Sequence, residues 1–212
     1  NVTFTGAVNG ANTLAVNSTG ATLFSAAVGG STALTSLTTD AGGTVSLLSV
    51  TTTGAQSYGE AATLNGTYTT TNAAFSVAGT TTLGGGTTVT VGSGPVTFTG
   101  AVNGANTLAV NSTGATLFSA AVGGSTALTS LTTDAGGTVS LLSVTTSGVQ
   151  SYGEAATLNG TYTTTNSAFS AAGTTTLGGG TTVTVGSGAV TFTGAVNGGN
   201  TLAVNSSAAT LF

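Results

Sequence analysis

Residues 2–8 read VTFTGAV, and the same seven residues return at 96–102 and again at 190–196. The offset is 94 residues each time, and residues 2–95 differ from residues 96–189 at only five positions, none of which gains or loses a charge. The differing pairs are Thr53/Ser147, Ala55/Val149, Ala73/Ser167, Val77/Ala171 and Pro95/Ala189. A repeat of this kind predicts an array of stacked units, each of which buries its apolar side chains against the next.

Three copies of the unit fill the chain, at 2–95, 96–189 and 190–212. The third copy stops within the unit, so we expect residues 1–212 to form one continuous array that is cut from a longer one. Each full copy divides further into four looser sub-repeats of unequal length, at about 2–21, 22–49, 50–74 and 75–95 in the first copy.

Short alternations of apolar and polar residues run through every sub-repeat, as in Val2-x-Phe4, Phe75-x-Val77 and Val89-x-Val91. A period of two over three to five residues indicates a β-strand with one buried face. Gly-Gly, Asn-Gly and Ser-Gly pairs between these runs supply the turns. No window carries apolar residues at the 3.6-residue spacing of a helix.

Sub-repeats that hold about three short strands each are typical of a β-helix, in which every coil pairs in parallel with the next at a spacing of about 4.8 Å. The sequence therefore predicts an all-β fold, a parallel β-helix (β-solenoid) with about four coils in each 94-residue copy. Right-handed winding is the default for parallel crossover connections. A chain of β-sandwich modules is the alternative, and it fits the 94-residue period but not the sub-repeats within it.

The spacing of the phenylalanines predicts an internal aromatic ladder. Phe75, Phe98 and Phe118 follow one another at similar intervals, each of which we interpret as one coil, and Phe169, Phe192 and Phe212 are their copies. Phe24 precedes Phe75 by about two such intervals, so we expect Leu47, Leu48 or Val50 to fill the ladder position between them.

The composition excludes several classes of partner. The chain has no Lys, Arg, His, Cys, Met or Trp, and its only acids are Asp40, Glu60, Asp134 and Glu154. Binding of nucleic acids or of anionic membrane surfaces relies on Lys and Arg, and no apolar run approaches the length needed for membrane insertion. Disorder is disfavoured because 39% of the residues are hydrophobic.

The same composition leaves little for chemistry. Nucleophilic catalysis needs a base beside Ser or Thr, and no His, Lys or Cys is present. Asp40 and Glu60 are well separated in the sequence, and we interpret each as marking a solvated turn and not as half of a paired-carboxylate site. One Asp per copy is too few for a calcium site. We therefore expect no catalytic, cofactor-binding or metal-binding residue and no enzyme activity.

Two further motifs have structural interpretations. Gly84-Gly85-Gly86 is followed by neither Lys nor a helix pattern, so we expect a turn between Leu83 and Val89 and not a phosphate-binding loop. The four tyrosines could stack on sugars if exposed, but we expect them to point inward; they are Tyr58, Tyr68, Tyr152 and Tyr162.

Segments such as VTFTGAVNGANTLAVNSTGATLF at 2–24 and SVTTTGAQSYGEAATL at 49–64 resemble the repeat regions of very large bacterial exoproteins. These are the filamentous-haemagglutinin-like and autotransporter-like adhesins with β-strand repeats, and the resemblance covers essentially the whole chain. It implies secretion to the bacterial cell surface or the extracellular space and a parallel β-helical shaft. It brings no catalytic residue.

The expected function is that of a structural shaft or filament segment, with a mechanical or adhesive role. The expected partners are a second copy, through end-to-end stacking of coils, or the continuation of the parent chain, together with a glycan or host surface as the ligand of an adhesin. The alternative is an ice-binding or glycan-binding β-solenoid, because Thr makes up about a quarter of each copy and Thr-x-Thr pairs are frequent.

Overall fold

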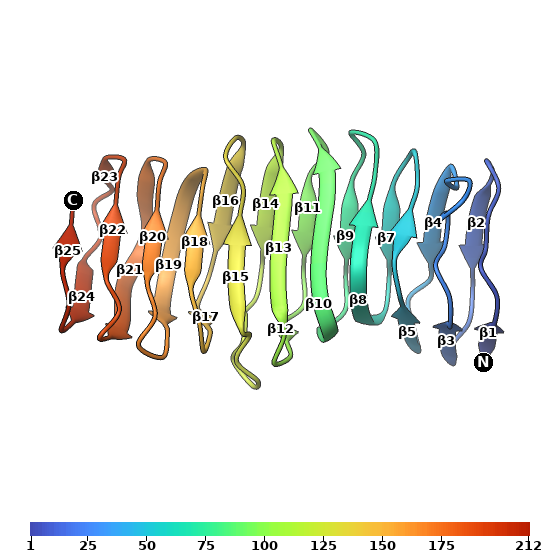
Figure 1. The fold of residues 1–212 in the computed structure, drawn as a ribbon, viewed down its shortest axis with the longest axis horizontal. Coiled ribbons are helices and arrows are strands. Elements are labelled where there is room, and N and C mark those ends of the chain that lie inside the picture. Colours follow the sequence, from blue (N-terminus) through green and yellow to red (C-terminus); the bar gives the residue numbers. More distant parts are fainter.

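The computed structural model describes all 212 residues as 25 short β-strands and contains no helix (Figure 1). The first twelve strands are β1 (Val2–Phe4), β2 (Thr13–Val16), β3 (Ala21–Phe24), β4 (Ser36–Thr39), β5 (Thr44–Leu47), β6 (Val50–Thr51), β7 (Gln56–Tyr58), β8 (Ala61–Thr69), β9 (Phe75–Val77), β10 (Thr81–Gly92), β11 (Val96–Phe98) and β12 (Val102–Asn103). The other thirteen are β13 (Thr107–Ser112), β14 (Ala115–Phe118), β15 (Ser130–Thr133), β16 (Thr138–Leu141), β17 (Val144–Thr145), β18 (Gln150–Tyr152), β19 (Ala155–Thr163), β20 (Phe169–Ala171), β21 (Thr175–Gly186), β22 (Val190–Phe192), β23 (Val196–Asn197), β24 (Leu202–Ser206) and β25 (Thr210–Leu211).

The strands wind into a parallel β-solenoid of about ten coils. Every strand pairing is parallel, and hydrogen bonding joins the strands into one sheet of 13 and one of 12. Figure 1 shows the strands lying across the long axis and the chain advancing steadily along it from the N-terminus to the C-terminus. The predicted fold class, an all-β parallel β-helix, is confirmed.

Three columns of stacked, inward-facing residues run along the solenoid, and each coil visits them in the order A, B, C. Column A holds Val2, Thr22, Val45, Ala62, Thr81, Val102, Val122, Val144, Tyr162, Val183 and Val204. Column B holds Val8, Val28, Val50, Tyr68, Val89, Val110, Thr133, Tyr152, Ala171 and Phe192. Column C holds Leu14, Leu37, Gln56, Phe75, Val96, Thr116, Val139, Ala156, Thr175 and Val196.

The copies of the 94-residue unit do not lie above one another. Val2 is the first residue of column A, whereas its copy Val96 is the fifth residue of column C. Val8 is the first residue of column B, and its copy Val102 is the sixth of column A. One copy therefore winds through four and two-thirds coils, so that each copy is rotated by a third of a turn from the last. The prediction of about four coils per copy is refined accordingly.

The coils are shorter than some of the expected sub-repeats. Column A marks where successive coils begin, at Val2, Thr22, Val45, Ala62, Thr81 and Val102. The sub-repeats expected at 22–49 and 50–74 each exceed any of these coils, so their boundaries were wrong. The reason is that all three columns carry similar Val, Leu and Phe side chains, and such a pattern does not tell which strand returns to which column.

Two local expectations are also corrected. Gly84, Gly85 and Gly86 lie within β10, where the register with β8 shifts between Leu83 and Thr87, so they form a strand irregularity and not a turn. Phe24 stacks on Phe4 beside column A, whereas Phe75 belongs to column C, so these two phenylalanines do not share a ladder. Leu47 continues the Phe24 position beside column A and pairs with Leu64, Val50 is buried in column B, and Leu48 is exposed.

The interior is a single apolar core that extends through the whole stack. A cluster of 39 buried residues, mostly Val, Leu, Phe and Tyr, connects the coils, and the strand residues between them face outward. The outward residues of column C are largely hydroxylated, with Thr38, Ser57, Ser76 and Thr97 on four successive coils. The period-two pattern of the sequence is thus the alternation between core and surface.

Candidate functional site

The six phenylalanines of the expected ladder form two groups of matching geometry. Phe98 and Phe118 lie in register, with ring centroids 5.1 Å apart and an interplanar angle of 4°. Phe75 pairs in register with Val96, so its ring contacts Phe98 diagonally at 5.7 Å and 53°. The copies repeat these contacts at 5.5 Å between Phe169 and Phe192 and at 5.3 Å between Phe192 and Phe212.

The ladder therefore includes one diagonal step in each copy, because one coil leads from Phe75 to Val96 and not to Phe98. Five of the six rings are buried, and Phe212 is 70% exposed. A further stacked pair, Phe4 and Phe24 at 4.6 Å, lies outside the expected set.

The four tyrosines are completely buried, as expected from their inward positions in the alternation. Tyr58 and Tyr68 pack edge-on against the ring of Phe75 at 5.8 and 5.6 Å. The Tyr58 hydroxyl donates to Gln56 Oε1 at 3.1 Å, and the Tyr68 hydroxyl donates to the Leu47 carbonyl at 3.2 Å. Burial raises the pKa of both phenols. Rings in these positions are out of reach of a sugar.

Gln56 and its copy Gln150 are buried polar residues that the sequence reasoning missed. Gln56 Nε2 donates to the Val50 carbonyl at 3.2 Å and to the Thr69 carbonyl at 2.9 Å, and it lies 3.3 Å from Thr52 Oγ1. The amide thereby crosses the core from column C to column B and joins two successive coils. The available signal was the alternation Gln56-Ser57-Tyr58, which places Gln56 on the same face as the buried Tyr58.

Asp40 marks a turn, as expected, but its carboxylate also has a structural partner. Asp40 Oδ1 accepts a hydrogen bond from the Ser18 backbone N–H on the preceding coil at 2.8 Å. Asp134 does the same for the Ser112 N–H at 2.9 Å. Asn9 Oδ1 similarly accepts from the backbone N–H groups of Ser31 and Thr32 on the next coil. The hydrogen bonds to these side chains thus link the turns of neighbouring coils.

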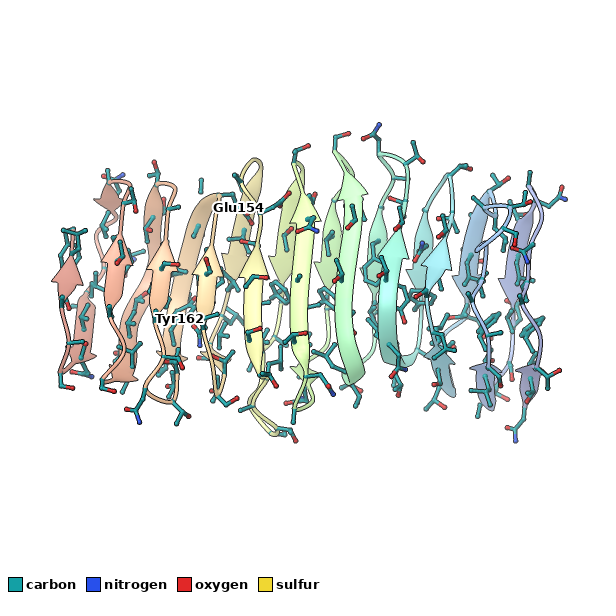
Figure 2. All side chains as sticks on the ribbon, in the orientation of Figure 1. Glu154 and Tyr162 are labelled. Atoms are coloured by element: carbon teal, nitrogen blue, oxygen red, sulfur yellow. The ribbon has the colours of Figure 1, made fainter.

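Glu60 does not occupy the solvated turn that the sequence predicts. Its side chain is 4% exposed, and Oε2 is fully covered without a hydrogen-bond partner. Glu154 has the same burial and the same unpartnered atom. In Figure 2, Glu154 lies near one edge of the stack, whereas Tyr162 lies well within it. Charged side chains are seldom buried without a partner, which is why the sequence pattern favoured the surface.

Burial is the main cause of the shift in the titration of both acids. It raises the pKa of Glu60 and raises the pKa of Glu154 to about 7. For Glu154 the neighbouring Thr133 hydroxyl lowers the pKa in part, and the Asp134 carboxylate raises it. Thr39 and Asp40 act on the pKa of Glu60 in the same two directions.

Asp40 and Glu60 lie on neighbouring coils at one corner of the solenoid. Gly59 stacks directly on Asp40, because a Cβ at Gly59 would lie 2.7 Å from the Asp40 carbonyl oxygen. The two carboxyls are thus brought together, but Asp40 is engaged with a backbone N–H and Glu60 is buried. No group of three or more His, Cys, Asp or Glu side chains gathers here or elsewhere in the molecule, and the surface has no pocket.

Paired threonines form a polar array on the outer surface of column B. Thr67 and Thr69 on β8 lie in register with Thr88 and Thr90 on β10. Thr51 continues the second row on the preceding coil, and Asn111 continues it on the following coil. The copy of this array surrounds Tyr162 and Val183 on column A, a third of a turn away.

The molecule contains no helix that could span a membrane. Comparison of the chain with family models, curated proteins and solved structures finds no match. Any function of the chain must therefore be inferred from the solenoid itself, with its three columns and its two buried acids.

Proposed function

We propose that the chain is a structural shaft or filament segment of a secreted bacterial surface protein, with a mechanical or adhesive role and no catalysis. The observation that carries this proposal is the continuity of the three columns, which run without a break through all three copies of the repeat. Each copy adds coils and length but no new side-chain chemistry, because the copies are nearly identical. Such growth in one dimension is the property of a shaft.

The uncharged composition supports the same function. Without Lys, Arg or His the outer surface is formed largely by Thr, Ser, Asn and Gly with a few exposed Leu side chains, and neighbouring coils are held by backbone hydrogen bonds along the axis. The absence of a basic side chain to activate Ser or Thr supports a role without catalysis.

The lack of Cys and the resemblance to repeats of bacterial exoproteins support a location outside the cell. The partner is a further stretch of the same repeat, by chain continuation or by end-to-end stacking, and the shaft presents an adhesive surface to a glycan or host cell.

The length of the particle tests the shaft. Chains with two, four and six complete copies are compared by electron microscopy and small-angle X-ray scattering. At about 4.8 Å per coil, each added copy is expected to lengthen a rod of constant width by about 22 Å. Separate modules of this size, with a radius of gyration of about 13 Å, would add roughly 35 Å each and give a flexible string. That result, or particles that widen with copy number, would contradict the proposal.

Ice or glycan binding is a second candidate, and the array of Thr67, Thr69, Thr88 and Thr90 favours it. The rotation of successive copies limits such an array to a few coils before it moves to another side. Thermal hysteresis and glycan-array binding are measured for the chain and for a variant in which these four residues are replaced by Val. Activity in the chain that the variant loses would make this the function; equal signals in both, or none, would remove it.

A further inference from the structure

Each full copy of the repeat contains one cluster of three buried polar atoms that have no hydrogen-bond partner. In the first copy these atoms are Glu60 Oε2 and the hydroxyls of Thr39 and Thr81. Thr39 and Thr81 are 7% and 1% exposed. Thr39 lies at the end of β4 on the coil before Glu60, and Thr81 follows the corner glycine, Gly79, that stacks on the Glu60 backbone.

The second copy repeats the cluster with Thr133, Glu154 and Thr175. Because the copies are rotated, this cluster lies between columns B and C, whereas the first lies between columns C and A. The same three atoms are thus unpartnered in two differently oriented surroundings. Buried polar groups are normally paired, so the recurrence points to a property of the repeat.

No positive charge is available to neutralise either carboxylate. The chain has no Lys, Arg or His. The ionisable group that faces Glu60 is the Asp40 carboxyl, from the turn after β4. The Tyr58 phenol of β7 donates to Gln56 instead, and β9 and β10 contribute none. Around Glu154 the corresponding group is the Asp134 carboxyl, whereas the Tyr152 phenol donates to Gln150 and the Tyr162 phenol to the Leu141 carbonyl, and β20 and β21 contribute none. An ionised carboxylate at either position would be buried beside another negative charge, which is unfavourable.

We propose that Glu60 and Glu154 are proton-binding positions, which keep their corners of the solenoid closed as neutral carboxylic acids and loosen them on ionisation. A protonated Oε2 gains a donor of its own at the corner, whereas a carboxylate keeps the favourable influence of the Thr39 or Thr133 hydroxyl but is desolvated by burial and repelled by the neighbouring Asp. A proton needs no cavity, in keeping with a surface that has no pocket. In an array of many copies the same position recurs every 94 residues, so one change in pH acts on the whole shaft.

The direction of the pH dependence follows from the burial of the acids. Burial raises the pKa of Glu154 from 4.5 to about 7 and raises the pKa of Glu60, so the folded chain binds these protons more tightly than the unfolded chain. The resulting stability is fully present below about pH 4.5 and is lost as the pH rises to about 7. The shaft is therefore most stable in mild acid.

The test compares the whole 212-residue chain with its E60Q/E154Q variant. The urea midpoint of each is measured between pH 4.5 and pH 9, and the carboxyl carbons of the two glutamates are titrated by NMR in the unmodified chain. The midpoint of the unmodified chain is expected to fall over this range, that of the variant to stay constant, and the Glu154 resonance to titrate near pH 7. Glutamate resonances that titrate near pH 4.5, or a constant midpoint in the unmodified chain, would overturn the proposal.

Two further arms separate proton binding by the glutamates from titration of the aspartates and from cation binding. In the D40N/D134N variant the amide oxygen can still accept a hydrogen bond from the Ser18 or Ser112 N–H. The fall in the urea midpoint with pH is therefore expected to persist in this variant, and its disappearance would assign the effect to the aspartates.

Millimolar Ca²⁺ is added to the unmodified chain at pH 8.5 and is expected to leave the midpoint unchanged. A rise in the midpoint that E60Q/E154Q lacks would make the cluster a cation site and refute the proton-binding role. The NMR titration decides the question even if a variant fails to fold.

Discussion

At the scale of the residue, the buried side-chain amides of Gln56 and Gln150 donate hydrogen bonds to backbone carbonyls inside the core. Gln56 Nε2 serves two carbonyls on successive coils. We predict that Gln56→Ala destabilises the chain by about 2–4 kcal/mol, because it removes packed volume and leaves buried carbonyls without a donor. Urea unfolding measures the change. Thr67→Ser at an exposed position is the control, with an expected change of within about 0.5 kcal/mol; equal effects would mean that the amide adds nothing to stability.

Burial alone separates two phenylalanines that occupy the same place in the repeat. Phe118 is 1% exposed and stacked on Phe98, whereas its copy Phe212 is 70% exposed. We predict that Phe118→Leu lowers the free energy of unfolding by about 1–2 kcal/mol and that Phe212→Leu changes it by less than about 0.5 kcal/mol. Thermal or urea unfolding of the two single variants provides the comparison. A larger loss for Phe212→Leu would contradict the stacking order.

At the scale of the element, close stacking at the corners requires glycine. A methyl group at Gly100 would collide with the carbonyl of Gly79 on the coil beneath, whereas one at Gly6, the same place in the preceding copy, would meet no atom within 4 Å. Gly100→Ala is therefore expected to cost about 2 kcal/mol or more, and Gly6→Ala to be neutral or slightly stabilising. Neither glycine has a positive φ, so the difference reports stacking alone. Chemical unfolding of both variants decides it, and matching losses would contradict the coil register.

The strands were predictable from the sequence, but their stacking was not. The alternation in Val2-Thr3-Phe4 and Phe75-Ser76-Val77 gives each strand its buried face directly. The register depends on which coil lies beneath, and Phe75 meets Val96 and not Phe98 because the coil that begins at Phe75 closes at Val96. Glu60 illustrates the same limit at the candidate site. A lone acid beside Gly59 looks like a surface turn, and only the neighbouring coils reveal that its carboxyl is covered.

At the scale of the whole molecule, the rotation of successive copies spreads each feature around the shaft. The threonine array of column B returns on column A in the next copy, and the buried acids move from one corner to another. A ligand that needs one long flat face would find it interrupted every few coils. A shaft that is loaded along its axis needs no continuous flat face. The backbone hydrogen bonds between neighbouring coils are of the same kind on all three columns, so the load is shared around the shaft. This distribution favours a mechanical role over a one-sided binding surface.

The same rotation predicts a screw symmetry that electron microscopy can measure. In a longer array of identical 94-residue copies, a rotation of one third of a turn with a rise of about 22 Å should superimpose each copy on the next. Three copies then fill fourteen coils, so the density should repeat without rotation every 67 Å or so, about fourteen strand spacings. Helical reconstruction of a twelve-copy rod measures both values. Copies related by a simple translation, with no rotation between them, would show that a copy winds through a whole number of coils and would refute the assignment of Val2 and Val96 to different columns.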